Sequence, residues 1–248
     1  MSLRNRRIGL VLIGDELLSG KRTDKHMGKT IELLAARGLQ LSWVRMVGDD
    51  VALLTDTLRQ SFAEGDIVFS FGGIGATPDD VTRQCAAAAA DVELALHPEA
   101  AAIIEERFGE EAYPNRILMA EFPEGADLIP NPVNQIAGFS YRHHHFLPGF
   151  PNMAWPMLEW VLEYWYRDIF NQTPPVERLM LLQNVAESEL IPLMEACIKR
   201  HPEVRLASLP STENRRQIEI GLKGEAAQVA AASEWFAEEL RRMGVSWR

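Results

Sequence analysis

The chain has 248 residues, of which 47% are hydrophobic and 24% are charged, and its formal net charge is −10. This is the composition of a globular protein long enough for one large domain, or for one domain and a smaller one. The acidic balance excludes general nucleic-acid binding, because negative charge repels phosphate backbones. The only two cysteines, Cys85 and Cys197, lack metal-ligand spacing and indicate no disulfide framework, so a cytoplasmic protein is expected.

A basic stretch and a short apolar run, Ile8–Ile13, begin the chain. The run is too short to span a membrane, and no signal-cleavage pattern follows it. We therefore expect a buried first strand and no membrane partner.

Predicted strands and helices alternate over the first 90 residues. Apolar positions at helical spacing predict a helix from about Asp24, a possible cap, to about Ala36. The elements predicted next are strands at Leu39–Val47 and Asp66–Phe71 and helices at Val51–Ala63 and Asp79–Ala90. This order predicts a three-layer α/β/α fold with a mostly parallel sheet, which binds ligands beyond the carboxyl ends of its strands.

The pattern weakens beyond residue 90. It predicts helices at Pro98–Phe108 and Pro156–Phe170, and short strands at Asp127–Pro130, Ala137–Tyr141 and Phe146–Pro148. Consecutive prolines mark Asn171–Pro175 as a linker. The residues after this linker predict a strand at Glu177–Val185 and a helix at Glu187–Arg200. They then predict two strands, at Val204–Leu209 and Gln217–Lys223, and a helix at Ala226–Met243. We expect one domain at 1–170 and a small C-terminal α+β domain at 176–248.

The segment FSFGGIGATPDDVT, residues 69–82, is the strongest functional candidate. Its glycines let the backbone approach a ligand closely, and the helix that follows offers free N–H groups to an anion. Asp79 and Asp80 are placed in the first turn of that helix, with Thr77 as a possible cap. Acidic residues are also common at helix starts, and this explanation of the pair is as good as a functional one. An anion beside two carboxylates needs a cation such as Mg²⁺.

A second polar segment, IGDELLSGKRTDKHMG, covers residues 13–28. By itself it is typical of a solvated loop, but its place after a buried strand favours a site. Lys21, Arg22 and Lys25 could contact phosphates, and Asp15 or Glu16 could hold a metal or polarise a water.

Three shorter features have competing interpretations. In VGDD, residues 47–50, capping of the next helix by Asp49 or Asp50 is favoured over function. Of the three histidines at 143–145, only the first and third could share a metal, and an exposed edge strand or turn is favoured. Gly221–Gly224 has the spacing of an RNA-clamping loop, but RNA binding is not expected of an acidic chain.

The motifs IGDELLSGKRTDKH, VGDD, GGIGATPDDVT and LPGFP, in this order, resemble the molybdopterin-binding-like domain of MogA/MoaB and CinA proteins, with the CinA branch nearest. The resemblance covers about Arg7–Tyr166, and LASLPSTENRRQIEIGLKG is similar to the KH-like middle domain of CinA proteins. It implies that the C-terminal amidase of full-length CinA, which deamidates nicotinamide mononucleotide, is absent. It also implies a homo-oligomer, either a dimer or a trimer.

The resemblance assigns roles to residues. Asp80 and Asp49 match aspartates linked to pterin activation in MogA-type proteins, and with Glu16 they are the candidate catalytic residues. The candidate metal ligands are Asp79, Asp80 and Glu16. The candidate ligand-binding residues are Gly14, Asp15, Ser19, Gly20, Asp24, Lys25, Gly72, Gly73, Gly75, Thr77, Pro148 and Gly149.

CinA-type domains imply metal-dependent hydrolysis of ADP-ribose to AMP and ribose 5-phosphate. The alternatives are a molybdopterin- or nucleotide-binding protein without hydrolysis, and a scaffold without turnover. CinA proteins commonly carry Thr-Glu in place of Asp15-Glu16 and Thr-Asn in place of Asp24-Lys25. After LPGFP they carry Ser-Glu-Met, whereas this chain has Asn152-Met153-Ala154. The missing glutamate slightly favours the alternatives.

Overall fold

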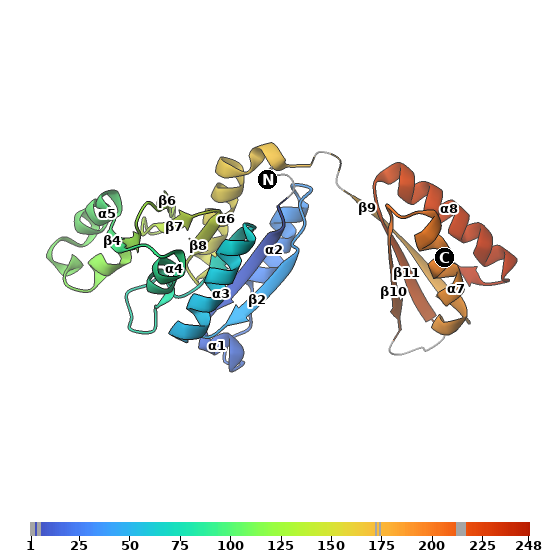
Figure 1. Cartoon of the computed structure of the whole chain (residues 1–248), viewed down its shortest axis with the longest axis horizontal. Helices are drawn as coiled ribbons and strands as arrows, with labels where there is room; N and C mark the ends of the chain where they lie inside the picture. The colour runs from blue at the N-terminus through green and yellow to red at the C-terminus, as the bar shows by residue number, and fades with distance from the viewer. Residues whose placement is uncertain (1–2, 4–5, 172, 174, 212–216) are drawn as a thin grey trace. The chain divides into compact units, whose positions relative to one another are not determined.

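The chain forms two compact units, Met1–Phe170 and Asn171–Arg248 (Figure 1). The computed structural model describes residues 3, 6–171, 173, 175–211 and 217–248. The linker predicted at Asn171–Pro175 includes residues 172 and 174, which lie outside the described residues. Within the described ranges, no helix is long and apolar enough to cross a membrane.

A six-stranded sheet in the order β2-β1-β3-β8-β7-β6 forms the centre of the first unit. Strands β2, β1, β3 and β8 are parallel, and β7 is antiparallel to both β8 and β6. The carboxyl ends of β1, β3 and β8 therefore meet at one edge. The strands span β1 Ile8–Ile13, β2 Trp43–Val47, β3 Ile67–Phe71, β6 Asp127–Ile129, β7 Gly138–Tyr141 and β8 His144–Leu147.

Helices cover both faces of this sheet (Figure 1). Helices α2 and α6 pack on the face that holds Leu10 and Leu12, and α3 and α4 pack on the face that holds Val11 and Ile13; α5 joins the same hydrophobic cluster as α3 and α4. The helices span α1 Asp15–Leu18, α2 His26–Ala35, α3 Val51–Glu64, α4 Thr82–Ala90, α5 Pro98–Phe108 and α6 Pro151–Trp165. Short elements complete the unit: β4 Leu94–Leu96 paired with β5 Glu121–Pro123, and the 3-10 turns η2 Gly109–Ala112, η3 Arg116–Ala120 and η4 Arg167–Ile169.

Burial on both faces explains why β1 is apolar throughout. Its one glycine, Gly9, lies under the indole of Trp43, and a methyl group there would be only 2.0 Å from the ring. The predicted three-layer fold with a mostly parallel sheet is confirmed.

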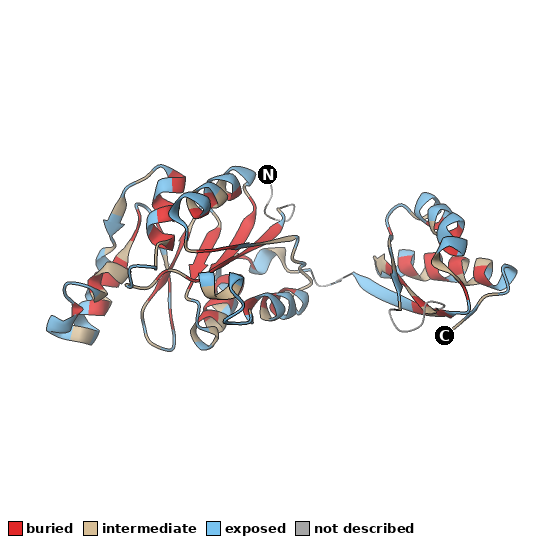
Figure 2. Cartoon of the chain, turned by 90° about the horizontal axis from the view of Figure 1, so that it is seen from below, coloured by how far each residue is buried: buried red, intermediate tan, exposed pale blue. Residues whose placement is uncertain are grey.

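The second unit is a small α+β domain, as predicted. Its antiparallel sheet has the order β10-β11-β9-β12, and α7 and α8 pack on one face around a separate core (Figure 2). The elements span β9 Val176–Gln183, α7 Glu187–Arg200, β10 Arg205–Pro210, β11 Gln217–Gly224, α8 Ala226–Arg242 and β12 Ser246–Trp247.

The predicted boundaries of α4, α6 and β2 were wrong. Helix α4 begins at Thr82 rather than Asp79, because the carboxylate of Asp80 accepts hydrogen bonds from Thr77 and holds the preceding residues in a loop. Helix α6 begins at Pro151, where a proline suits the first turn, and ends at Trp165, so the predicted range Pro156–Phe170 was displaced. Strand β2 begins at Trp43 rather than Leu39, since its pairing with β1 starts there.

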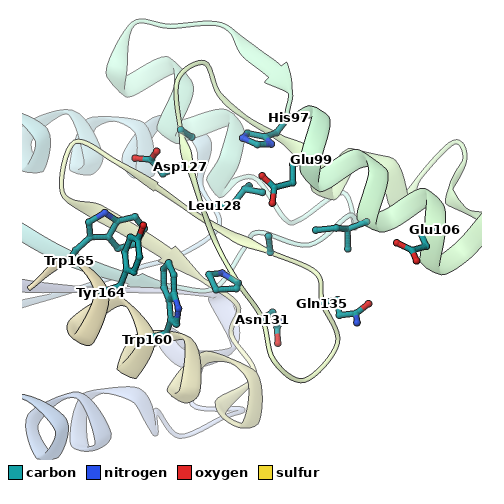
Figure 3. Close-up of a pocket in the computed structure, with 14 residues that line it drawn as sticks. His97, Glu99, Glu106, Asp127, Leu128, Asn131, Gln135, Trp160, Tyr164 and Trp165 are labelled. Carbon is teal, nitrogen blue, oxygen red and sulfur yellow. The ribbon is translucent and has the colours of Figure 1, made fainter.

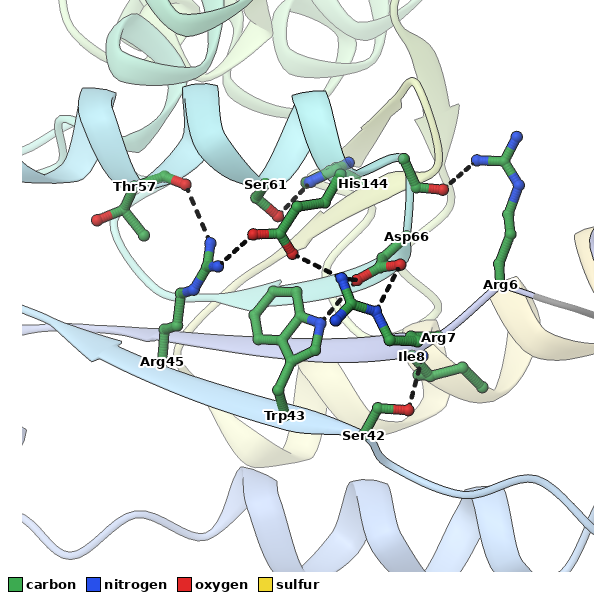
Figure 4. Close-up of polar contacts among 12 residues, drawn as sticks. Arg6, Arg7, Ile8, Ser42, Trp43, Arg45, Thr57, Ser61, Asp66 and His144 are labelled. Carbon is green, nitrogen blue, oxygen red and sulfur yellow. Dashed lines mark hydrogen bonds and ion pairs between the residues drawn. The ribbon is translucent and has the colours of Figure 1, made fainter. Parts of the chain in front are cut away.

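The placement of the histidines at an exposed edge or turn was right for His143, which lies half-buried in the turn before β8, and wrong for His144 and His145. Strand β8 lies between β3 and β7, and both His144 and His145 are buried. The Oγ of Ser61 lies 2.7 Å from Nε2 of His144 (Figure 4). His145 lies 2.7 Å from both the Ser140 Oγ and the Tyr166 hydroxyl. Buried hydroxyl groups therefore serve as hydrogen-bond partners for the imidazole rings of His144 and His145.

Candidate functional site

A cavity of about 350 Å³ opens where β1 and β3 end. Its walls come from the segment after β1, the start of α2, the end of β3 and the turn after β8. The lining residues are Ile13, Glu16, Leu17, Arg22, Thr23, Asp24, Lys25, His26, Phe71, Gly149 and Pro151. The cavity therefore combines cationic, anionic and aromatic groups at the edge where this fold class binds ligands.

Stacked rings of His26 and Phe71 form one wall, with centroids 4.3 Å apart and planes at 20°. His26 is only 6% exposed, and this burial lowers its pKa, against the opposing effects of the Gly149 carbonyl and Asp24. The neutral ring donates from Nε2 to the Gly149 carbonyl oxygen at 3.2 Å, which leaves Nδ1 without a partner among the described residues.

Asp24 holds this wall in place. Its two carboxylate oxygens accept hydrogen bonds from the backbone N–H groups of His26 and Met27, at 2.9 and 3.0 Å. Asp24 therefore satisfies the first free donors of α2, as expected of a residue at a helix start. It also fixes the position of the His26 ring.

Glycines allow the strand ends to approach one another beside the cavity. Gly72 has φ +108, and a methyl group on it would lie 2.3 Å from the carbonyl oxygen of Ile13. A methyl group on Gly149 would lie 3.5 Å from the Cα of Gly72. The ends of β1 and β3 and the turn after β8 are thus brought together through backbone alone.

Asp15 and Asp49 join two loops by reciprocal hydrogen bonds. The Asp15 N–H donates to Oδ2 of Asp49 at 3.0 Å, and the Asp49 N–H donates to Oδ1 of Asp15 at 3.2 Å. Burial raises the pKa of Asp49; the hydrogen bond from Asp15 lowers it, and the charges of Asp15, Glu16 and Asp79 raise it further. Asp49 therefore belongs to an acidic cluster formed by Asp15, Glu16, Asp49 and Asp79.

The next residue, Asp50, caps helix α3. Its side chain accepts a hydrogen bond from the backbone N–H of Leu53 at 2.7 Å. Capping therefore accounts for Asp50 and leaves Asp49 in the acidic cluster.

Residues 74–81 form a loop tied at both ends. Oδ2 of Asp80 accepts from the Thr77 backbone N–H at 2.9 Å and from the Thr77 hydroxyl. A methyl group on Gly75 would lie 2.4 Å from the same oxygen. Arg83, which is 1% exposed, donates to the carbonyl oxygens of Gly75 at 2.7 Å and of Leu118. Burial lowers the pKa of this guanidinium, and the charge of Glu121 opposes that effect.

The structure brings only part of the predicted set into the cavity. Glu16, Asp24, Lys25 and Gly149 line it. The predicted residues that do not line it are Gly14, Asp15, Ser19, Gly20, Asp49, Gly72, Gly73, Gly75, Thr77, Asp79, Asp80 and Pro148. In the part of the chain that the structure describes, no three His, Cys, Asp or Glu side chains are grouped to hold a metal ion.

Sequence reasoning missed the aromatic wall. Phe71 was placed at the end of a predicted strand and inside the candidate segment 69–82 but was given no role, and His26 lay in the segment 13–28 without a role. The sequence position of each residue was the available signal. Phe71 directly precedes Gly72, and His26 lies two residues after Asp24, the predicted helix cap.

Residues 9–168 match the family model described as a probable molybdopterin binding domain. The chain belongs to this family. A CinA-like protein of Geobacter sp. (strain M21) is 31% identical over 247 residues, which cover 96% of this chain and 58% of that protein. A CinA-like protein of Citrifermentans bemidjiense is 33% identical over 208 residues, which cover 81% and 50%. The chain thus spans about half the length of these CinA-like relatives.

The fold agrees with this membership of the molybdopterin-binding family. The crystal structure of CinA from Thermoplasma acidophilum, described as a protein with unknown function, matches with a TM-score of 0.59 and 26% identity. The match covers 67% of this chain and 100% of that chain. The first unit is therefore a CinA-like domain of the family.

Proposed function

We propose that the cavity of the first unit binds a small phosphorylated ligand with a heterocyclic ring, of the nucleotide or pterin type. One juxtaposition carries this proposal: the stacked rings of His26 and Phe71 lie in the same cavity as the cationic side chains of Arg22 and Lys25. Phe71 is 1% exposed and His26 is 6% exposed, so the rings give the cavity an aromatic lining that suits a heterocycle, and the cations attract phosphate. The family description as a probable molybdopterin binding domain supports a pterin-type ligand.

We further propose hydrolysis of ADP-ribose as the reaction of this site. The supporting observation is the acidic cluster beside the cavity, in which Asp49 has a raised pKa and so accepts a proton more readily than an ordinary carboxylate. Asp49 takes a proton from a water whose oxygen bonds to one phosphorus of the diphosphate. The bond from that phosphorus to the bridging oxygen breaks, and the products are AMP and ribose 5-phosphate.

A divalent ion belongs to this proposal because carboxylates repel a diphosphate. At 4 Å, each like-charge contact costs about 4 kcal/mol at an effective dielectric of 20, whereas micromolar binding is worth about 8 kcal/mol. The proposed ligands are Glu16, Asp79 and Asp80. Since no group of three is preformed among the described residues, the ion would need oxygens of the ligand's own phosphates as well. Its role there is to neutralise charge.

Ligand binding can be tested with ADP-ribose and a pterin monophosphate, each in Mg²⁺ and in EDTA. We expect ADP-ribose to raise the melting temperature only when the metal is present. Arg22→Gln should weaken binding about tenfold, and Lys21→Gln is the matched control because Lys21 does not line the cavity. Equal affinities in the two variants would show that the ligand lies elsewhere.

Turnover can be tested by AMP release from ADP-ribose with Asp49→Asn and Asp50→Asn. Each variant removes one negative charge, and asparagine keeps the cap at position 50. We expect the first to lose activity at least a hundredfold and the second to keep it. Asp80→Asn should also lose activity without a change in melting temperature. Binding by the wild-type protein without turnover would favour the alternative of a binding protein, which the absent glutamate after LPGFP also favours.

We propose that the second unit is a KH-like domain. Its strand–helix–strand–strand–helix order and antiparallel sheet support this assignment. RNA binding is not part of the proposal, since the chain is acidic. Tight, salt-sensitive binding of single-stranded RNA to the full chain would contradict the expectation that the chain does not bind RNA. A dimer or trimer also remains a prediction, which light scattering would test.

A further inference from the structure

A second cavity, of about 720 Å³, lies in the first unit and shares no lining residue with the candidate site. It is bounded by α5, by α6 and by the edge strand β6 with the turn after it (Figure 3). Helix α5 contributes Glu99, Ile103 and Glu106, whose spacing of four and three places them on one helical face. This volume lies within the range of roughly 300–1,000 Å³ found for small-molecule sites.

An aromatic wall is formed by three residues of α6. The rings of Trp160 and Tyr164 are stacked, with centroids 4.6 Å apart and planes at 11°. Trp165 meets both rings edge-on at 5.2 Å. Tyr164 is 67% exposed, so this wall is not simply part of the core. The negative faces of such rings attract cations.

Two carboxylates face this wall from the other side of the pocket. Figure 3 shows Glu99 and Glu106 on α5, across the pocket from Trp160 and Tyr164, whereas Asp127 on β6 lies on the same side as Trp165. None of the three carboxylate groups makes a hydrogen bond or an ion pair with a described residue, and no lysine or arginine lines the pocket; all three residues are exposed. The position of Glu99 in the first turn of α5 is favourable by itself, because the N-terminal end of a helix attracts negative charge. This effect does not apply to Glu106 or Asp127.

We propose that this pocket binds a small organic cation, whose charged group lies between the aromatic wall of α6 and the carboxylates of α5, with Asp127 of β6 beside the aromatic wall. The ring faces and the carboxylates both attract positive charge. A phosphorylated ligand would be repelled by the same groups. The two cavities of the first unit therefore suit ligands of opposite charge.

Choline and 3,3-dimethylbutan-1-ol are suitable probes, since they have the same shape and differ by a positively charged nitrogen in place of carbon. In calorimetric titrations of the full chain, we expect choline to bind at least tenfold more tightly than the neutral alcohol. Tyr164→Ala and Glu106→Gln should each weaken choline binding at least fivefold. Glu159→Gln is the matched control, because Glu159 is exposed on α6 and does not line the pocket.

Equal affinity for the two probes, or no choline binding at millimolar concentration, would overturn the proposal. So would choline binding that survives both Tyr164→Ala and Glu106→Gln unchanged. Melting curves establish that each variant is folded. Binding of ADP-ribose should be the same in these variants and in the wild type, which separates this test from that of the proposed function.

Discussion

Acidification is expected to destabilise the first unit through His144. This residue is fully buried in β8, with Nδ1 3.2 Å from the carbonyl oxygen of Arg142 and Nε2 2.7 Å from the Ser61 hydroxyl. Burial lowers the pKa of His144 from 6.5 to about 4. The Arg142 carbonyl and the charge of Asp66 oppose this shift, and the charges of His143 and Arg45 add to it.

The direction of the effect follows from proton uptake. An unfolded chain protonates this histidine below pH 6.5, whereas the folded protein does so only below about pH 4. Between these values the unfolded state holds more protons, so the free energy of unfolding falls as the pH falls. The loss from His144 alone is about 2 kcal/mol between pH 7 and pH 5, and about 3 kcal/mol once the pH is below 4.

Two measurements test this reasoning. An NMR titration of the His144 ring should give a pKa near 4. Urea unfolding at pH 7 and pH 5 should show a pH-dependent loss about 2 kcal/mol smaller in the double variant Ser61→Ala/His144→Phe than in the wild type. The double variant removes the hydroxyl together with the imidazole, so that neither is left unpartnered. A ring that titrates near pH 6.5, or an identical pH dependence in both proteins, would refute the argument.

Three further predictions concern stability measured by denaturant unfolding. Gly73→Ala should cost about 2 kcal/mol or more, because φ is +67 and a methyl group would lie 2.2 Å from Thr82 Oγ1. Gly20→Ala, at φ +72 with nothing within 4 Å, should cost only about 1 kcal/mol, and equal losses would show that the contact with Thr82 relaxes freely. Asp50→Ala should cost about 1 kcal/mol through loss of the α3 cap, whereas Asp50→Asn should change stability little; equal costs would exclude capping. Phe236→Ala should cost about 3–5 kcal/mol because its ring is fully buried in the second unit, and a loss below about 1 kcal/mol would contradict that packing.

The fold class was predictable because burial leaves a direct mark on sequence. Strand β1 contacts helices on both faces, so nearly every position is apolar, and Gly9 is the exception required by Trp43. Helical spacing and turn residues revealed most of the helices for the same reason. These signals are local; the order of the strands was not predicted, and it includes an antiparallel pairing of β7 with both β6 and β8.

The candidate site was less predictable because its geometry depends on contacts between distant segments. Asp80 looked like a residue of the first helical turn, since only the structure shows its bonds to Thr77. His26 becomes part of the cavity through the carbonyl of Gly149, 123 positions away. Asp49 and Asp50 are indistinguishable by pattern, and only the cap bond to Leu53 separates their roles.

The buried guanidinium of Arg83 has a consequence for the order of the loop at residues 74–81. Because its planar group holds the carbonyls of Gly75 and Leu118 at fixed positions, the inner end of the loop is already ordered before any ligand arrives. The entropy lost in ordering that end is therefore lost on folding and not on association.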